Sequence, residues 1–359
     1  SNVDLCVTHD SINKGLYAEY GVKKGLRDEN GQGVLTGLTN ISQITAFKFI
    51  DGVKTPCDGE LLYRGYNVQD IVNGSTGKKF IFEEGAYLLL FGELPTESQL
   101  SKFKIALSDG MELPTNFTRD VIMKAPTADI MNSMTRSILT LASYDKDKDN
   151  LELSNVLRQC MMLISTFPMM AAYAYHAYNH YENNGSMYIH RPDPELSIAE
   201  NFLRMIRPDQ KYTELEARVL DIALLLHMEH GGGNNSTFTT RVVTSSGSDT
   251  YSAIAAAMSS LKGNIMVMNM IDDIRHHVSD FYDEDEIKNY LKKILNKETF
   301  DKQGLIYGMG HAVYSLSDPR EKVFKRFVEQ LAEEKHRNDD MTLYNNIEKL
   351  APKVIAEKR

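Results

Sequence analysis

The stretch TELEARVLDIALLLHMEHGGGNNS, residues 213–236, predicts an amphipathic helix that runs into three glycines. Thr213 and Glu216 have the spacing of a capping box, in which each side chain bonds a backbone N–H at the helix start. Apolar residues then recur every three or four positions, as in a helix with one buried face: Leu215, Val219, Ile222 and Leu226. We expect this helix to end in Gly231-Gly232-Gly233.

Similar start and stop signals divide most of the remaining chain into helices. Apolar residues recur at helical spacing over residues 83–92, and Thr96 with Gln99 forms a second capping box. Asp249 is an N-cap candidate for a helix that Gly263 is expected to stop. We therefore predict an all-α, mostly helical fold.

Two segments near the N-terminus favour short β-strands instead. Residues 41–50 mix β-branched and aromatic side chains and are bounded by Asp51-Gly52, a pair typical of hairpin turns. Residues 59–66, GELLYRGY, predict a turn and a short strand that leads into a helix. On its residues alone, this second segment is a structural corner.

The composition narrows the class of protein. The 359 residues include 49 acidic and 40 basic side chains, so the formal net charge is -9 and the positive field that binds nucleic acid is missing. Cys6, Cys57 and Cys160 lie far apart and show no C-x-x-C spacing. They frame neither a zinc site nor a disulfide scaffold, which favours a reducing compartment.

Residues 159–181 lack Asp, Glu, Lys and Arg, and they are long enough to compare with a membrane span. Pro168, His176 and several tyrosines interrupt the segment, so a buried helix is expected instead. Residues 1–4 carry no initiator Met, apolar signal core or Arg-rich bias. The expected location is the cytoplasm, without membrane contact.

Side chains that could carry chemistry gather at the end of the helix predicted to begin at residue 213, where it meets its glycines. His227 and His230 lie three positions apart before flexible backbone and the polar Asn234 and Ser236, an arrangement that suits a metal or an anionic substrate. The metal interpretation is weaker, because zinc-protease helices place their histidines four positions apart and no third ligand is nearby. Histidines satisfied within the core are the structural alternative.

A second group lies in GMGHAVY, residues 308–314, and in the DPR that ends at Arg320. Gly308 and Gly310 let the backbone pass close to a ligand and leave His311 beside it. Arg320 can offer a bidentate fork to a carboxylate. The alternative is a tight interhelical turn with a surface arginine.

Four segments, in this order, resemble the citrate synthase family: GELLYRGY at 59–66, EEGAYLLLFGELPT at 83–96, HMEHGGGNNS at 227–236 and GMGHAVYSLSDPR at 308–320. The resemblance covers nearly the whole chain. It is strongest to the bacterial type, in a branch that looks Gram-positive or anaerobe-like.

The resemblance implies a mostly helical homodimer with an active site in the cleft between a large and a small domain. We expect the large domain at residues 1–263 and the small domain at 264–359, without the return to the large domain that the family carries. The family's enzymes condense acetyl-CoA with oxaloacetate and water to give citrate and CoA, a step of the tricarboxylic acid cycle. No metal and no cofactor beyond the CoA thioester is implied.

The resemblance also implies roles for individual residues. His311 matches the histidine that polarises the oxaloacetate ketone, where a prepositioned donor stabilises the charge that builds on the oxygen. His230 and Arg320 match residues that bind oxaloacetate, a dianion that needs a local positive cluster in a protein of net charge -9, and His227 is grouped with them. The remaining positions are two polar residues behind the substrate, Asn234 and Ser236, and the backbone that cradles the CoA adenine, at Leu305, Ile306, Gly308 and Gly310.

The sequence departs from the family at Gly263-Asn264. A helix stop there meets a new apolar segment with no loop between them, and the family's H-G-G-A-N segment with its enol-stabilising histidine is missing. An ungapped alignment places Met266 on that histidine, and a thioether cannot donate the required hydrogen bond. We prefer the alternative in which Asn264 closes that segment and several residues are missing before it.

A second departure concerns the family's catalytic aspartate and C-terminal arginine, which belong to a segment beyond Arg359. Both departures are expected if the sequence joins parts of a longer protein whose active-site loop and C-terminal segment are mobile. A true deletion would instead leave a catalytically dead, substrate-binding helical dimer. A further alternative is 2-methylcitrate synthase, because the extra methylene of propionyl-CoA is worth only about 1–3 kcal/mol of discrimination.

Overall fold

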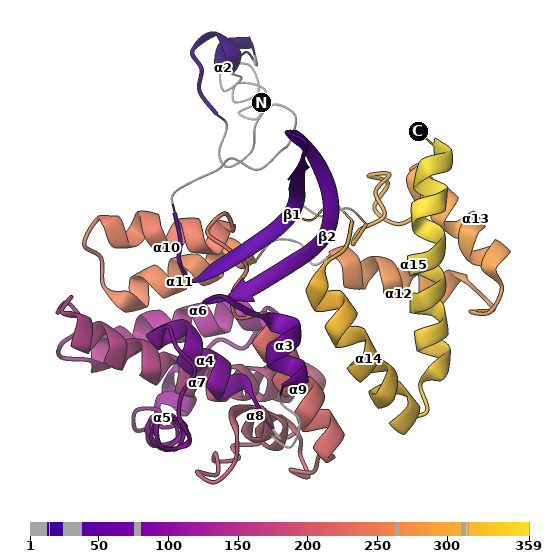
Figure 1. The fold of residues 1–359 in the computed structure, drawn as a ribbon. Helices are drawn as coiled ribbons and strands as arrows, with labels where there is room; N and C mark the ends of the chain where they lie inside the picture. The colour runs from indigo at the N-terminus through magenta and orange to yellow at the C-terminus, as the bar shows by residue number, and fades with distance from the viewer. Residues whose placement is uncertain are drawn as a thin grey trace, which may run out of the picture.

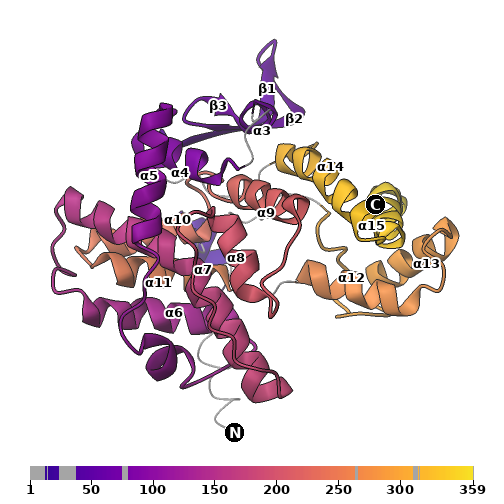
Figure 2. The same cartoon turned by 90° about the horizontal axis from the view of Figure 1, so that it is seen from below.

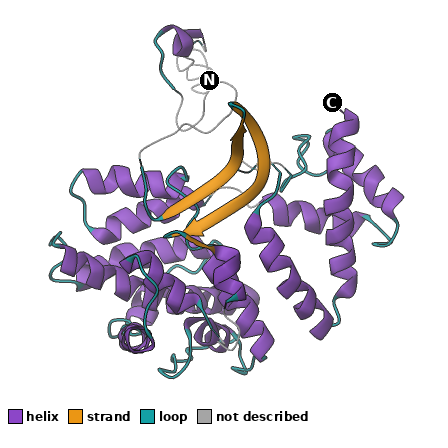
Figure 3. Cartoon of the chain, in the orientation of Figure 1, coloured by secondary structure: helices purple, strands orange, loops and turns teal. Residues whose placement is uncertain are grey.

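The computed structural model describes residues 13, 15–23, 38–74, 80–262, 266–309, 314 and 316–358. Over these residues the chain is mostly helical, with one small antiparallel sheet, which confirms the predicted fold class (Figures 1 and 3). The α-helices are α2 (Gly15–Glu19), α3 (Val68–Asn73), α4 (Phe82–Phe91), α5 (Glu97–Asp109), α6 (Ile130–Leu141), α7 (Leu153–Asn183), α8 (Ile198–Ile206), α9 (Glu214–Leu226), α10 (Asn235–Ser245), α11 (Thr250–Leu261), α12 (Met266–His277), α13 (Glu284–Leu295), α14 (Pro319–Glu334) and α15 (Asn338–Lys358). Two short turns, η1 (Thr118–Ile122) and η2 (Ala142–Tyr144), are π- and 3₁₀-helical.

A β-hairpin near the N-terminus is formed by β1 (Ser42–Ile50) and β2 (Val53–Tyr63). Asp51 and Gly52 connect the strands with φ angles of 52° and 80°, as a type I′ turn requires. The two-residue strand β3 (Tyr66–Asn67) pairs with the end of β2 and leads directly into α3. Both segments in which strands were predicted therefore contain them.

The charge-free segment at 159–181 lies within α7, a helix of 31 residues with Pro168 in its interior. Its buried apolar side chains, among them Met170 and Tyr173, belong to one hydrophobic core. The prediction of a buried helix is thus confirmed. Among the described residues no helix is long and apolar enough to cross a membrane.

The predicted helix caps are present. Thr96 with Gln99 and Thr213 with Glu216 each form both reciprocal bonds of a capping box, and Asp249 accepts a hydrogen bond from the Ser252 backbone at the start of α11. These signals are local, since a cap needs only the four residues that make it.

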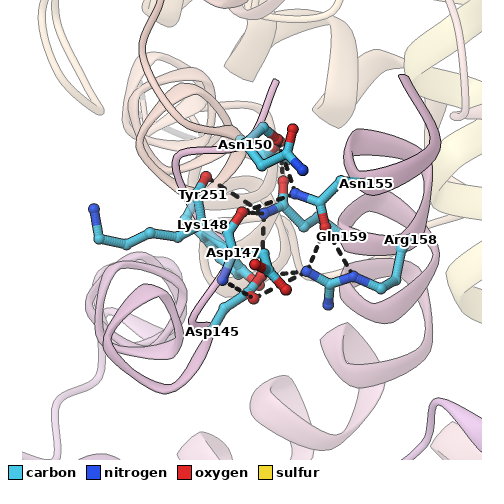
Figure 4. A network of polar contacts seen from close by, with 9 residues as sticks. Asp145, Asp147, Lys148, Asn150, Asn155, Arg158, Gln159 and Tyr251 are labelled. Atoms are coloured by element: carbon cyan, nitrogen blue, oxygen red, sulfur yellow. Dashed lines mark hydrogen bonds and ion pairs between the residues drawn. The ribbon is translucent and has the colours of Figure 1, made fainter. Parts of the chain in front are cut away.

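Asp145 organises the loop between α6 and α7 and ties it to α11 (Figure 4). Its carboxylate accepts hydrogen bonds from Arg158 at 2.7 Å, from the Tyr251 hydroxyl at 2.7 Å and from the Gln159 amide at 3.0 Å. Burial alone raises the pKa of Asp145, but these donors outweigh it and hold the pKa at about 2. The loop is therefore fixed by a carboxylate that stays ionised at neutral pH.

A second hydrophobic core lies entirely within residues 264–359. Side chains of α12, α13 and α15 form it, including Ile274, Leu291 and Leu343, all fully buried. The predicted division into domains of 1–263 and 264–359 stays a prediction, and residues 263–265 lie outside the described residues.

Helix α14 belongs to a different core from its sequence neighbours. Val323, Phe324 and Phe327 pack with Tyr63 of β2 and Ile222 of α9. At the far end of this contact, the Thr213 hydroxyl donates to Glu334 at 2.7 Å and Lys335 pairs with Glu216 at 2.7 Å, so α9 and α14 run antiparallel (Figure 2). The carboxyl end of α9 consequently lies beside the start of α14.

Candidate functional site

The carboxyl end of α9 is set by a tyrosine from the hairpin. The buried hydroxyl of Tyr63 donates to the carbonyl of Leu225 at 3.0 Å and to that of Glu229 at 3.2 Å. Helix α9 stops at Leu226 with His227 as its C-cap, so the prediction that it continues to Gly231 was wrong. The carbonyl of Leu225, which a further helical turn would use, is bonded by Tyr63 of β2.

The turn after α9 is held from inside by Glu229. Its carboxylate accepts the backbone N–H of Gly231 at 2.6 Å and the hydroxyl of Ser42 at 3.0 Å. Gly231 has a φ of +83°, and a Cβ there would lie 2.7 Å from the Ile44 methyl. Glycine is favoured here because the backbone is left-handed, and a Cβ would in addition require the Ile44 side chain to shift.

His230 is presented by this turn, and the predicted polar residues behind it contact the turn's backbone. Asn234 donates from its amide to the carbonyls of His230 at 2.8 Å and of Gly231 at 3.3 Å. Ser236 lies in the first turn of α10, where its carbonyl accepts the Thr240 hydroxyl at 2.8 Å. Asn234 thus supports the backbone of the histidine directly, whereas the Ser236 carbonyl accepts a hydrogen bond from within its own helix.

His227 lies at the edge of the cluster. Its ring is exposed, and Nδ1 bonds the carbonyl of Ala223 at 2.7 Å, one turn back in the same helix. The structure therefore gives His227 a capping role.

A second tyrosine lies against His230. The ring of Tyr314 meets the imidazole at 5.3 Å between centroids with an interplanar angle of 68°, an edge-to-face contact. Tyr314 is only 5% exposed. Burial first, and the charge of Asp318 second, raise the pKa of Tyr314 to about 12 against the opposing effect of Arg320. The phenol is therefore neutral at physiological pH.

Arg320 occupies the first turn of α14 and is held by Asp318. The guanidinium donates to the two carboxylate oxygens of Asp318 at 3.0 Å and 2.6 Å, and the same carboxylate caps the helix by accepting the Arg320 backbone N–H at 2.9 Å. Burial lowers the pKa of Arg320, but Asp318 outweighs burial and the pKa is raised. Arg320 is thus a permanent cation, with its side chain 20% exposed.

The structure brings His230, Tyr314, Arg320 and Tyr63 into one cluster, since the charge of Arg320 acts on both tyrosines. Neither tyrosine was assigned a role from sequence. Tyr63 stands in a segment interpreted as a structural corner, and Tyr314 stands three residues after His311. Their positions inside two of the quoted motifs were the available signal.

Other predicted site residues are placed apart from this cluster or are not placed. His311 and Gly310 lie outside the described residues. Ile306 is 4% exposed and packs into the second core, whereas Leu305 is 55% exposed and Gly308 has a φ of +88°. Ile306 could therefore contact a ligand only through its backbone, because its side chain is committed to the core.

The cluster has the chemistry of an anion site. A half-buried cation, a histidine and two neutral phenols surround one region, and such a cation binds a carboxylate more strongly than an exposed one does. Across the parts of the chain described here, no three His, Cys, Asp or Glu side chains gather in a geometry for a metal ion.

Comparisons with known proteins point in one direction. A family model described as "Citrate synthase, C-terminal domain" matches residues 30–359. A citrate synthase of Corynebacterium glutamicum is 31% identical over 89% of this chain and 69% of its own length. A 2-methylcitrate synthase of Shewanella oneidensis is 32% identical over 76% of this chain and 67% of its own length. The solved ternary complex of carboxymethyl coenzyme A and oxaloacetate with the citrate synthase of Thermoplasma acidophilum has a TM-score of 0.75 and 25% identity, over 97% of this chain and 80% of that one.

Proposed function

The chain belongs to the citrate synthase family, whose members are transferases that form a carbon–carbon bond, and from this premise we propose that it condenses acetyl-CoA with oxaloacetate and water to give citrate and CoA. We further propose that the cluster of Arg320 and His230 binds oxaloacetate. The branch of the family and the roles of single residues are part of this proposal.

The observation that carries the assignment is the place of Arg320, a half-buried cation, in one cluster with His230 and Tyr314. Asp318 fixes the guanidinium through Nε and one terminal nitrogen, so an oxaloacetate carboxylate would bind the other terminal nitrogen or displace Asp318. Oxaloacetate carries two carboxylates, and a protein of net charge -9 repels such a dianion except where a cation is locally dominant. Arg320 meets that need at the end of α9 that presents His230.

The proposed chemistry assigns charge stabilisation to His311. As acetyl-CoA adds to the ketone, negative charge builds on the ketone oxygen, and a fixed donor stabilises it typically by about 3 kcal/mol. The backbone at residues 305–310 is proposed to receive the CoA adenine, with the buried Ile306 side chain anchoring it. We propose no metal and no cofactor beyond the CoA thioester.

Two alternatives remain as proposals of lower rank. The 2-methylcitrate synthase likeness covers less of the chain than the citrate synthase likeness does. A substrate-binding protein without turnover is the second, because Asn264 directly follows Gly263 where the family carries its enol-stabilising histidine.

We expect the purified protein to form citrate and free CoA thiol from acetyl-CoA and oxaloacetate. The measurement is CoA thiol release, with citrate identified by mass spectrometry, and with acetyl-CoA or propionyl-CoA at equal concentration. A kcat/KM ratio of about tenfold in favour of acetyl-CoA is expected, the value of one methylene. A propionyl preference would make it a 2-methylcitrate synthase, and oxaloacetate binding without product would make it a binding protein.

We also propose a cytoplasmic homodimer. Helices α6, α7, α10 and α11 contact one another in series and carry exposed apolar side chains, namely Leu139, Tyr175, Val242 and Leu261. Light scattering is expected to give twice the 40.6 kDa of the chain. The double variant Leu139→Glu/Val242→Glu is expected to have half that mass in solution. An unchanged dimer in this variant would place the interface elsewhere.

A further inference from the structure

We infer that Tyr314, seated in a notch that Gly59 leaves in β2, is a positioning residue that fixes the imidazole of His230 for substrate binding. The inference rests on the proposed function of the cluster. Two contacts support it. Tyr314 packs against Gly59 at a distance that only glycine permits, and the ring of Tyr314 contacts the ring of His230.

The notch is the space where a side chain at Gly59 would be. A Cβ built on Gly59 would lie 2.2 Å from the Ser317 carbonyl oxygen and 2.6 Å from Cδ1 of Tyr314. The φ of Gly59 is not in the left-handed region, so backbone conformation does not require glycine here. What requires glycine is the close approach of Tyr314 and Ser317 to the strand.

The strand also holds Ser317 by hydrogen bonds on the same side. The backbone N–H of Gly59 donates to the Ser317 hydroxyl at 3.3 Å, and that hydroxyl donates to Asp58 at 2.7 Å. Lys322 in the first turns of α14 pairs with the same Asp58 at 3.2 Å. Ser317 and Lys322 are therefore held at β2, on the strand residues Asp58 and Gly59 that also adjoin Tyr314.

Tyr314 reaches His230 through its ring. The two rings meet edge to face at 5.3 Å, and Tyr314 is 5% exposed, so its ring has little room to move. The turn that carries His230 is held on its other side by the Tyr63 hydroxyl. The histidine backbone is thus set by Tyr63 and its imidazole is set by Tyr314.

The charges around the phenol fit a positioning role. Asp318 raises the pKa of Tyr314 and Arg320 lowers it, while burial makes the largest contribution, so the phenol stays neutral between an anion and a cation. A neutral ring beside His230 adds no further negative charge next to Arg320. Tyr314 then acts through His230, and its ring is the part that matters.

Three variants test this inference. The KM for oxaloacetate, the KM for acetyl-CoA, kcat and the melting temperature are measured for each of them. Tyr314→Ala removes the ring, and Gly59→Ala pushes it aside. Each is expected to raise the KM for oxaloacetate about tenfold, the upper range for one edge-to-face pair, and to change the KM for acetyl-CoA less than about twofold. Tyr314→Phe keeps the ring and is expected to stay within about threefold of the wild type.

Gly185→Ala is the matched control for overlap. A Cβ there would lie 2.2 Å from the Asn179 amide nitrogen, at the end of α7 and remote from the cluster. Its KM for oxaloacetate is expected to equal that of the wild type whatever its melting temperature. A shift in this control equal to that of Gly59→Ala would mean that overlap alone perturbs binding.

A double-variant cycle separates positioning from packing. In a His230→Ala background, Tyr314→Ala is expected to add less than about twofold, because the residue through which it acts is gone. A tenfold effect that persists in that background overturns the inference, as does an unchanged KM in Tyr314→Ala and Gly59→Ala.

Calorimetry with oxaloacetate alone distinguishes this failure from failure of the proposed function. A wild type that binds but does not turn over is compared with its variants by Kd, with the same expected ratios. A wild type that neither binds oxaloacetate nor forms citrate removes the proposed function and this inference together.

Discussion

Replacing Arg320 with methionine is expected to raise the KM for oxaloacetate about a hundredfold, because truncating one partner of a buried, hydrogen-bonded charge pair costs about 2–5 kcal/mol. The variant keeps a side chain of similar length and removes the only part of it that can bind a carboxylate. It also leaves Asp318 facing the substrate with no cation between them. Steady-state kinetics with oxaloacetate varied at saturating acetyl-CoA measure the effect.

Arg326 of the same helix provides the control. Its guanidinium donates to the Asn73 side chain at 2.5 Å and lies over the Phe327 ring at 4.9 Å, so Arg326→Met removes a cation of α14 that is outside the cluster. Its KM is expected to stay within about twofold of the wild type, as for an exposed pair. Arg320→Lys keeps the charge without the fork and is expected to fall between the two. An unchanged KM in Arg320→Met would remove Arg320 from the oxaloacetate site.

Asp221, a buried carboxylate of α9, is expected to make the protein less stable as the pH rises. Asp221 is fully buried and accepts the backbone N–H groups of Ile81 at 2.8 Å and of Phe82 at 3.0 Å. Glu83 is 3% exposed and accepts the N–H of Ile198 at 2.8 Å through one oxygen. Among the described residues its other oxygen has no hydrogen-bond partner, and Glu83 lines a cavity of about 330 Å³.

The sign of the effect follows from the pKa of Asp221. Burial first, and the charge of Glu83 as well, raise it from 3.8 to about 7 against the opposing backbone hydrogen bonds. The folded state therefore binds this proton more tightly than the unfolded state does. The stabilisation is complete below about pH 3.8 and is lost as the pH rises through 7, which amounts to about 3 kcal/mol between pH 5 and pH 8. Urea unfolding at the two pH values measures it.

Glu83→Gln isolates this contribution from other titrating groups. The glutamine keeps the oxygen that accepts from Ile198, and it replaces the oxygen without a partner by an uncharged amide. We expect the variant to be more stable than the wild type at pH 8 and to lose stability less steeply with pH, because the charge of Glu83 is one of the causes that raise the pKa of Asp221.

Glu97→Gln is the control, since Glu97 is an exposed carboxylate in the first turn of the neighbouring helix α5. It is expected to change stability by less than about 0.5 kcal/mol. If Glu83→Gln were less stable than the wild type at pH 8, the unpaired oxygen would have to be stabilising in its charged form.

The site shows how far single motifs carry a prediction. His230 and Arg320 were selected from two motifs 90 residues apart, and the antiparallel packing of α9 on α14 places both motifs at one end of that helix pair. The roles of Tyr63 and Tyr314 could not be predicted from sequence, because a tyrosine within a motif does not indicate which backbone group or ring it will contact. The partners of Tyr63 are more than 160 residues away in sequence.

Local chemistry alone decides the helical character of the chain and its hairpin turn. It also decides the helix caps at Thr96, Thr213 and Asp249, because each depends on residues within four positions of one another. The end of α9, the burial of Asp221 and the seat of Tyr314 depend on β2, α4 and the segment before α14. Those contacts join residues distant in sequence, and close packing chooses among the alternatives that local preference allows. The resemblance named the chemistry of the site, and the packing of three distant segments decided which side chains support it.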